Sequence, residues 1–508
     1  MAFSSVFSWL IKKRVRQIDL FKEFPLEVQN ELLSGLVHRG VETEWGRRYG
    51  FTGIDSFAQF QKAVPLSTYE EVKSDIQRVI DGAEDVLWPG EVRWFAKSSG
   101  TTSDRSKLIP VTKEALEDCH FKGGKDLLGL HVHHRPKSDI YKGKTLVVGG
   151  SSELHPLRSE AYTGDLSAII IKNLPLWVEF RRIPGKDIAL LGDWEEKMEK
   201  MALHSMDEDV TVISGVPSWT LVLIRRILEL KGTDNLMDVW PNLELYMHGG
   251  VSFSPYRDQY ETLIPSRSMT YLETYNASEG FFGIQDRPGA DDMLLTLDYG
   301  IFYEFIPLSE SHKEQPETIG LADVELGKVY EMVITTNAGL WRYRVGDTVR
   351  FTSRSPFRIQ VAGRTKQFIN VFGEELMVHN VEQALQQACH VHHAQVADYS
   401  VAPIYMEEGK PGGHEWAIEF TEQPEDLMSF TVTLDRVLMD INSDYAAKRT
   451  NDFNLRLPRI HVLEPGHFYA WMERRGKLGG QHKVPRLSND RKYLESILQG
   501  VIEMASGA

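Results

Sequence analysis

Short β-branched runs alternate with helix-length amphipathic stretches through most of this sequence. Gly and Pro residues separate the stretches, which marks them as successive elements. The candidate strands cover 145–148, 210–214, 243–246, 268–273 and 329–335, and 218–230 has apolar residues at helical spacing. Such alternation is typical of sheets covered by helices, so the sequence predicts an α/β fold.

The segment from about residue 366 onward has the pattern of a smaller α/β unit of its own. The expected elements are helices over 378–389, 426–449 and 491–504, and strands over 394–402, 415–420 and 459–463. We therefore predict a large N-terminal domain over 1–365 and a smaller, mobile C-terminal cap domain over 366–508.

Charge and cysteine content exclude several functions. The 508 residues hold 57 Lys plus Arg against 72 Asp plus Glu, a formal net charge of −15. An acidic chain repels a phosphate backbone, so no nucleic-acid partner is expected, although small anions need only a local cluster of positive groups. Two cysteines, Cys119 and Cys389, supply neither a disulfide framework nor a Cys-based zinc site, and they favour a cytoplasmic location.

The beginning of the sequence is apolar but does not have the order of a secretory signal. Its apolar residues 1–11 precede the basic residues of 12–16 instead of following them. We expect an amphipathic first helix on the protein's own core, and the alternative is docking on a membrane surface. No apolar run reaches the roughly 18 residues of a transmembrane segment.

The stretch 95–107 is a candidate phosphate-binding loop. Ser98, Ser99, Thr101 and Thr102 surround Gly100, and Lys107 follows seven residues after that glycine. Hydroxyls and backbone N–H groups can donate to phosphate oxygens, and the lysine adds charge. The Walker A spacing is absent from the chain. The alternative is a solvated Ser/Thr turn.

Three later segments add groups that suit a nucleotide. Within 271–280, Tyr275 is suited to stack on a purine and Glu279 to supply an oxygen ligand to Mg²⁺. Asp347 ends the turn of 341–347, where it is suited to accept from both ribose hydroxyls, and Arg364 with Lys366 follows in 363–367. Each has a structural alternative, as a core aromatic, a cap or a surface charge. Their occurrence in this order weakens that alternative.

The ordered motifs Ser-Ser-Gly-Thr-Thr, Tyr-Asn-Ala-Ser-Glu-Gly, Tyr-Arg-Val-Gly-Asp, Gly-Arg-Thr-Lys-Gln and Gln-His-Lys-Val-Pro-Arg resemble those of the Gretchen Hagen family of acyl-acid amido synthetases. This family is a branch of the acyl-adenylate-forming superfamily. The resemblance covers about residues 40 to 500. The sequence resembles the bacterial branch of the family more than the plant branch, because Ser103-Asp104 stands where many superfamily members carry glycine.

The resemblance implies a role for each motif residue. Ser98, Ser99, Gly100, Thr101, Thr102 and Lys107 would hold ATP phosphates, Gly249 and Gly250 would lie against adenine, and Tyr275 would stack on its other face. Ser278 and Glu279 stand where the family has its phosphate and magnesium contacts. Asp347 matches the aspartate that binds ribose, and Arg364 matches the arginine just before the hinge between the domains. Lys366 would be the hinge, and Lys483 the lysine that the small domain brings to the reacting centre.

The implied activity is an ATP-dependent ligation of a carboxylic acid to an amino acid through an acyl adenylate, with pyrophosphate and then AMP as leaving groups. Catalysis would consist mainly of charge neutralisation and positioning, with Lys107, Glu279 and Lys483 as the catalytic residues. The alternatives are a thiol acceptor in place of the amine, and a nucleotide-binding relative without turnover, which the altered loop at Ser103-Asp104 motivates.

Two further sets of residues receive weaker interpretations. Trp177, Val216 and Trp219 are tentative acyl-pocket residues, although a tryptophan at helical spacing is more often part of a core. The two His-x-His-His clusters at 131–134 and 390–393 have no cysteine beside them to complete a zinc set, so we expect no structural metal there. The acid, the amine acceptor and the oligomeric state are not determined by the sequence.

Overall fold

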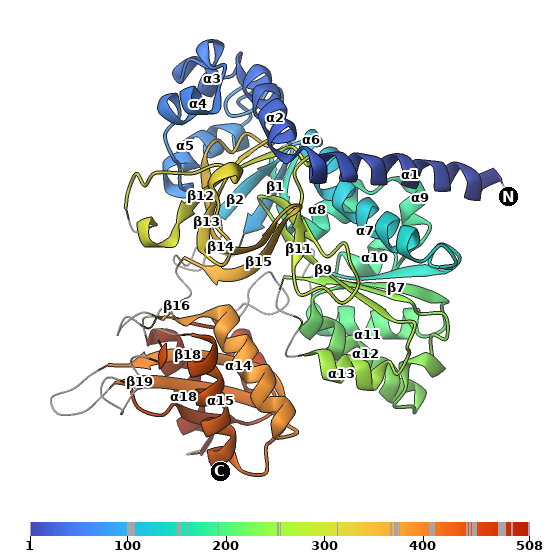
Figure 1. The fold of residues 1–508 in the computed structure, drawn as a ribbon. Coiled ribbons are helices and arrows are strands. Elements are labelled where there is room, and N and C mark those ends of the chain that lie inside the picture. The colour runs from blue at the N-terminus through green and yellow to red at the C-terminus, as the bar shows by residue number, and fades with distance from the viewer. Residues whose placement is uncertain are drawn as a thin grey trace. The chain divides into compact units, whose positions relative to one another are not determined.

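The computed structural model describes most of the chain and divides it into two compact units. The first unit consists of Met1–Val251 with Ile264–Val361, and the second of Ser252–Leu263 with Ala362–Ala508 (Figure 1). The described residues are 2–98, 107–149, 154–158, 160–191, 193–250, 253, 256–311, 313–365, 368–369, 374, 376–405, 412–442, 445–446, 449, 455–475, 484–488 and 491–505.

The first unit is built on an eleven-stranded sheet with the order β12-β13-β14-β15-β11-β10-β9-β8-β7-β3-β6. Its strands are β3 (Lys144–Val148), β6 (Arg182–Ile183), β7 (Val210–Gly215), β8 (Leu245–Gly249), β9 (Thr270–Ala277), β10 (Gly280–Ile284), β11 (Met293–Leu295), β12 (Ile301–Pro307), β13 (Val329–Thr336), β14 (Tyr343–Arg354) and β15 (Phe357–Arg364). Strands β6, β3, β7, β8 and β9 pair in parallel, whereas β9 through β11 and β12 through β14 pair antiparallel. The predicted α/β fold is therefore confirmed.

Helices follow the parallel strands, as crossover connections require. Between β3 and β9 lie α8 (Leu166–Asn173), α9 (Leu176–Glu179), α10 (Lys186–Ala189), α11 (Trp194–Ser205) and α12 (Pro217–Lys231). Helix α12 confirms the helix expected over 218–230: Pro217 begins it and Gly232, in the left-handed conformation, ends it. Asp193 caps α11 by accepting from Glu196 N at 2.7 Å.

A smaller four-stranded sheet has the order β2-β1-β5-β4. Its strands are β1 (Trp94–Ser98), β2 (Lys107–Val111), β4 (His155–Arg158) and β5 (Ala161–Gly164). Strand β1 pairs antiparallel with β2 and parallel with β5. The last residue of β1, Ser98, lies opposite the first residue of β2, Lys107. The candidate phosphate loop thus connects two paired strands.

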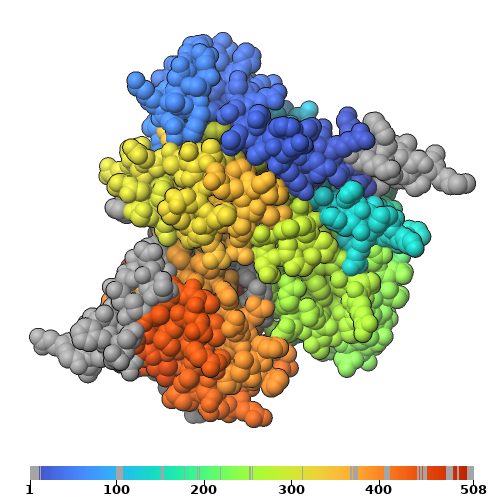
Figure 2. Space-filling view, in the orientation of Figure 1, coloured from blue at the N-terminus to red at the C-terminus, as the bar shows by residue number. Residues whose placement is uncertain are grey.

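The N-terminal helices pack on this framework. They are α1 (Ala2–Glu23), α2 (Pro25–Gly40), α3 (Glu44–Arg48), α4 (Phe57–Ala63) and α5 (Tyr69–Ile80), and after β2 come α6 (Lys113–Ala115), the π-helical turn η2 (Leu116–His120) and α7 (Phe121–His134). Helix α1 buries Ile18 and Phe21 in the core, which agrees with the expected docking on the protein itself. Figures 1 and 2 show α1 lying against α7. No helix among the described residues is long and apolar enough to cross a membrane.

The second unit contains a three-stranded sheet with the order β18-β19-β20, a two-stranded sheet of β16 and β17, and several helices. Its elements are α13 (Arg257–Leu263), β16 (Phe368–Ile369), β17 (Leu376–Met377), α14 (Val378–Val391), β18 (Gln395–Ile404), β19 (Gly413–Glu422), α15 (Leu427–Ile441), β20 (Arg459–Leu463), α17 (His467–Arg474) and α18 (Lys492–Ala505). The helix expected over 426–449 is wrong in length, because α15 ends at Ile441. Asn442 after it is extended, and its Oδ1 accepts from Tyr445 N at 2.8 Å, which caps a new turn.

Candidate active site

The parallel half of the large sheet brings the carboxyl ends of β3, β7, β8 and β9 to one edge. The register pairs Val148 with Gly215, Gly215 with His248, and Gly249 with Thr274. In open α/β sheets ligands bind outside the carboxyl ends of the strands, so this edge is the candidate ligand-binding edge of the sheet.

The two ends of the candidate phosphate loop are fixed by neighbours. Ser98 and Lys107 face each other across β1 and β2. Tyr69, the first residue of α5, accepts a hydrogen bond from Leu108 N at 3.0 Å, and Lys107 Nζ lies 5.7 Å from the centre of its ring. Ser99, Gly100, Thr101 and Thr102 lie outside the described residues, so their predicted phosphate contacts stay predictions.

Ser278 and Glu279 form the turn between β9 and β10, because Ala277 pairs with Gly280 across it. Both turn residues are buried. Ser278 Oγ donates to Lys97 O at 3.4 Å, so the turn touches β1 one residue before Ser98. The structure thus brings two of the predicted motif segments together.

A third motif segment reaches the same hairpin through Asp347. The Tyr275 hydroxyl donates to Asp347 Oδ2 at 2.7 Å, and both residues are buried. The Tyr275 ring packs edge-on against Phe282, with 4.9 Å between ring centres. Residues predicted to hold adenine and ribose are therefore in direct contact with each other.

Tyr343 is buried within electrostatic range of both carboxylates of the site. Burial raises its pKa well above the ordinary value, and the charges of Glu279 and Asp347 raise it further. Its buried hydroxyl has no hydrogen-bond partner among the described residues. Tyr343 belongs to the Tyr-Arg-Val-Gly-Asp motif, but no role was predicted for it.

The two arginines of that motif have structural partners. Arg342 is buried against Glu304, 2.9 Å away, and Arg344 pairs with Glu331 at 2.7 Å. These ion pairs hold the start of β14, and so they support the position of Asp347.

A group of charges, of which Asp165 and Lys197 are buried and Lys97 is half-buried, lies near the ends of β1 and β5. The parallel register pairs Ala96 with Gly164, so the next residues, Lys97 and Asp165, are neighbours. Burial raises the pKa of Asp165 to about 6, against the opposing effect of Lys97 and Lys197. Burial also lowers the pKa of Lys197 to about 8, and its Nζ donates to Gly149 O, 3.3 Å away at the end of β3. Sequence reasoning missed Asp165 and Lys197, because neither belongs to a recognisable motif.

The glycines predicted to face adenine end β8. A Cβ on Gly249 would lie 2.4 Å from Thr274 O, so only glycine lets β8 and β9 approach this closely. Gly250 has a φ of +84°, which disfavours other residues. The backbone geometry therefore explains glycine at both positions, independently of the predicted contact with adenine.

The three tentative acyl-pocket residues are not brought together. Val216 and Trp219 lie at the start of α12, directly after the carboxyl end of β7. Trp177 lies in α9, and α9 is at the opposite end of the sheet, because Lys144 at the start of β3 donates to Phe180 O at 3.0 Å. Val216 and Trp219 thus share the candidate edge of the sheet, and the predicted pocket role of Trp177 stays a prediction.

The remaining predicted residues belong to the second unit. Arg364 ends β15, while Lys366 and Lys483 lie outside the described residues.

The described residues hold no group of three or more His, Cys, Asp or Glu side chains suited to a metal ion. The histidine clusters have protein partners, with His134 Nε2 2.8 Å from Asp286 O and His392 Nε2 2.8 Å from Thr433 Oγ1. A single carboxylate such as Glu279 still fits Mg²⁺, which usually takes one or two carboxylates and completes its shell with phosphates and water.

Comparisons with known proteins agree along most of the chain. Models of the GH3 family N-terminal, central and C-terminal domains match residues 14–269, 294–364 and 379–492. The indole-3-acetic acid-amido synthetase GH3.4 of Arabidopsis thaliana is 25% identical, over 93% of this chain and 91% of its own.

Two solved structures share the fold. The GH3.15 acyl acid amido synthetase is 21% identical with a TM-score of 0.75, covering 93% of both chains. A 2-hydroxyisobutyryl-CoA ligase with a bound acyl-AMP is 13% identical with a TM-score of 0.59, covering 94% of this chain and 91% of its own.

Proposed function

This chain belongs to the GH3 family, and from that premise we propose that it is an ATP-dependent acyl-acid amido synthetase. Its relative GH3.4 is named for joining indole-3-acetic acid to an amine. The observation that carries the proposal is the convergence of three separate motifs: Ser278 contacts Lys97 beside the phosphate loop, and Tyr275 contacts Asp347. A membership in the bacterial branch is part of the proposal.

In the first half-reaction a carboxylate oxygen attacks the α-phosphorus of ATP, and the bond to pyrophosphate breaks. The phosphates would be held by Ser98, Ser99, Gly100, Thr101, Thr102, Lys107 and Ser278. Two anions must approach each other, so fixed positive charge and N–H donors lower the barrier most. Mg²⁺, held by Glu279 and the phosphates, supplies charge neutralisation when bound. Gly249, Gly250, Tyr275, Asp347 and Arg364 would orient the nucleoside.

In the second half-reaction the amine of an amino acid attacks the acyl carbon, and the bond to AMP breaks. The amine loses a proton as the amide forms. We propose that the second unit moves about Lys366 between the steps, so that Lys483 serves the first step and leaves for the second.

The acid is proposed to bind beside Val216 and Trp219, at the start of α12. Both side chains are partly buried at the ligand-binding edge of the sheet. An apolar and aromatic lining favours an acid with an aryl, indolyl or alkyl body. The proposed partners are small molecules only, and the two free thiols favour a cytoplasmic location.

A thiol acceptor is the second candidate, because a CoA ligase shares this fold. Product analysis separates the two. The protein is incubated with ATP, Mg²⁺ and an acid panel, together with either mixed amino acids or CoA, and the products are identified by mass. An amide supports the proposal, whereas thioester formation without any amide would overturn it.

A further inference from the structure

The turn that carries Ser278 and Glu279 is held at its base from outside the sheet. Asn276 and Phe281 are cross-strand partners, two residues before Ser278 and two residues after Glu279. Both are contacted by one short element, the π-helical turn η2 between β2 and α7.

Two consecutive residues of η2 make these contacts. His120 Nδ1 lies 3.1 Å from Asn276 Oδ1, and the backbone N–H of Phe281 donates to Cys119 Sγ at 3.2 Å. Because Asn276 Oδ1 accepts, the proton of the His120 ring is on Nδ1. Cys119 and His120 are both buried. One contact thus fixes each arm of the hairpin.

Irregular backbone on both sides makes this arrangement possible. The register of β9 and β10 shifts between Phe281 and Gly283, and the Phe281 N–H bonds to sulfur. In η2 the N–H of Phe121 bonds to Leu116 O, five residues back, which widens the helix. Such π-helical turns are rare and occur often at functional sites.

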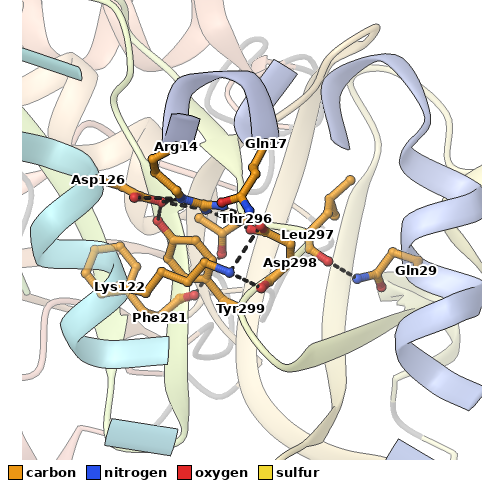
Figure 3. Close-up of polar contacts among 10 residues, drawn as sticks. All are labelled: Arg14, Gln17, Gln29, Lys122, Asp126, Phe281, Thr296, Leu297, Asp298 and Tyr299. Atoms are coloured by element: carbon orange, nitrogen blue, oxygen red, sulfur yellow. Dashed lines mark hydrogen bonds and ion pairs between the residues drawn. The ribbon is translucent and has the colours of Figure 1, made fainter. Parts of the chain in front are cut away.

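A charged cluster holds α7, the continuation of η2, against the loop between β11 and β12 (Figure 3). Lys122 Nζ donates to Asp298 O at 2.6 Å, and Asp126 accepts from Tyr299 Oη at 2.6 Å. Arg14 of α1 lies between Asp126 and Asp298, 2.6 Å from each. Helix α7 is therefore held to the loop between β11 and β12 by hydrogen bonds and partly buried ion pairs.

Helix α7 also packs closely against β10. A Cβ on Gly123 would lie 2.5 Å from the Phe281 ring, so this first turn of α7 sits directly on the ring. On its other side Phe281 O accepts from Thr296 Oγ1 at 2.8 Å. Both backbone polar groups of Phe281 are thus fixed by side chains outside the β9–β10 ladder.

From these contacts we infer that Cys119 and His120 are positioning residues for adenylation, which clamp the Asn276–Phe281 pair and thereby set the place of Ser278 and Glu279. This inference rests on the proposed function for the roles of Ser278 and Glu279. Outer residues that orient a metal ligand typically change metal affinity or activity 10–100-fold when lost. Neither residue is predicted to touch a substrate.

The test uses matched substitutions in the full chain. His120→Leu removes the donor, whereas His120→Asn returns an amide nitrogen near the position of Nδ1. Cys119→Ala removes the acceptor, and Cys119→Ser keeps one. His133→Leu, an exposed position of the same helix, is the control.

The first readout is hydrogen exchange of the peptide 274–283 without nucleotide. We expect faster exchange in His120→Leu and Cys119→Ala, and wild-type exchange in the control. Unchanged exchange in both variants would overturn the clamp. This readout does not depend on catalysis, so it judges the inference even if the wild type releases no pyrophosphate and the proposed function fails.

The second readout is the Mg²⁺ concentration that gives half-maximal acid-dependent pyrophosphate release. In His120→Leu we expect an increase of about tenfold, with the KM for the acid changed less than about twofold, and recovery to within about threefold in His120→Asn. An equal change in both constants, or no recovery in His120→Asn, would show a general packing role and overturn the inference.

Discussion

At the scale of single residues, the bond between Tyr275 and Asp347 is the contact on which the nucleotide assignment depends. Asp347→Asn keeps the size of the side chain but removes the charge that would accept from ribose. We predict a loss of at least about a hundredfold in acid-dependent ATP–pyrophosphate exchange. Tyr275→Phe removes only the hydroxyl bond and is expected to cost about tenfold or less. Asp323→Asn, at an exposed position, is the control. Activity within threefold of wild type in Asp347→Asn would contradict the assignment.

We predict that buried His120 makes the free energy of unfolding sensitive to acid. Burial lowers its pKa to about 4 in the folded state, whereas the unfolded chain has the ordinary value of 6.5. As pH falls from 6.5 towards 4, the unfolded state binds the proton and the folded state does not, so folding is disfavoured. The loss is about 1.4 kcal/mol at pH 5.5.

The measurement is the thermal unfolding midpoint at pH 7.5 and pH 5.5. Because His120→Asn cannot take up the proton, its midpoint should fall less on acidification than that of the wild type. His133→Asn, an exposed histidine, should fall as the wild type does. An identical fall in all three proteins would show that His120 titrates normally.

Residues of the candidate site could be predicted from the sequence only where they belong to a short motif. Tyr275, Ser278 and Asp347 stand in short patterns that identify them without any structure, and the fold brings them together. His120 and Asp165 stand in no pattern. Their importance comes from partners such as Asn276 and Lys197, which only the fold brings close.

At the scale of elements, α1 is held on the first unit by buried apolar residues such as Ile18 and by ion pairs, among which Arg14 lies between two carboxylates. Arg14→Met would leave Asp126, almost wholly buried, without its ion-pair partner. Breaking a buried pair by removing one member costs about 3 kcal/mol or more. We predict a clearly lowered unfolding midpoint for Arg14→Met. Arg16→Met, two residues away and exposed, should leave the midpoint almost unchanged. Equal midpoints would mean that the ion pairs of Arg14 do not stabilise the first unit.

Element type was more predictable than element ends and partners. Periodicity located β7 and α12 almost to the residue, since Pro217 and Gly232 mark the limits of the helix in the sequence itself. Periodicity predicted too long a helix at α15, because the hydrophobic pattern continues past Asn442, whereas the helix ends at Ile441. Sequence alone also does not show that α9, which carries Trp177, precedes β6 at the end of the sheet opposite to Val216.

At the scale of the whole molecule, the two-unit organisation predicts separable half-reactions. Lys366→Ala should leave acid-dependent ATP–pyrophosphate exchange within about threefold of the wild type, because the first unit holds most of the proposed adenylation residues. Amide formation should fall by about tenfold or more, because progress between the steps needs the hinge. Lys313→Ala, an exposed loop position in the first unit, serves as the control. An equal loss of both half-reactions in Lys366→Ala would contradict the hinge.

The overall fold class followed from alternation and motif order, but its connectivity did not. The segment Ser252–Leu263 joins the second unit although it lies between β8 and β9 of the first. It does so through contacts such as Tyr256 Oη with Ala397 O, 3.3 Å apart. The two residues are far apart in the chain, and no local pattern predicts such a pairing.

We propose that this chain activates an acid with ATP and transfers the acyl group to an amine. The most direct measurement is pyrophosphate release against a panel of aryl, indolyl and fatty acids, with and without mixed amino acids, followed by mass analysis of the products. We predict release that requires an acid, together with a new amide mass that requires an amino acid. ATP binding without acid-dependent release across the whole panel would contradict the claim.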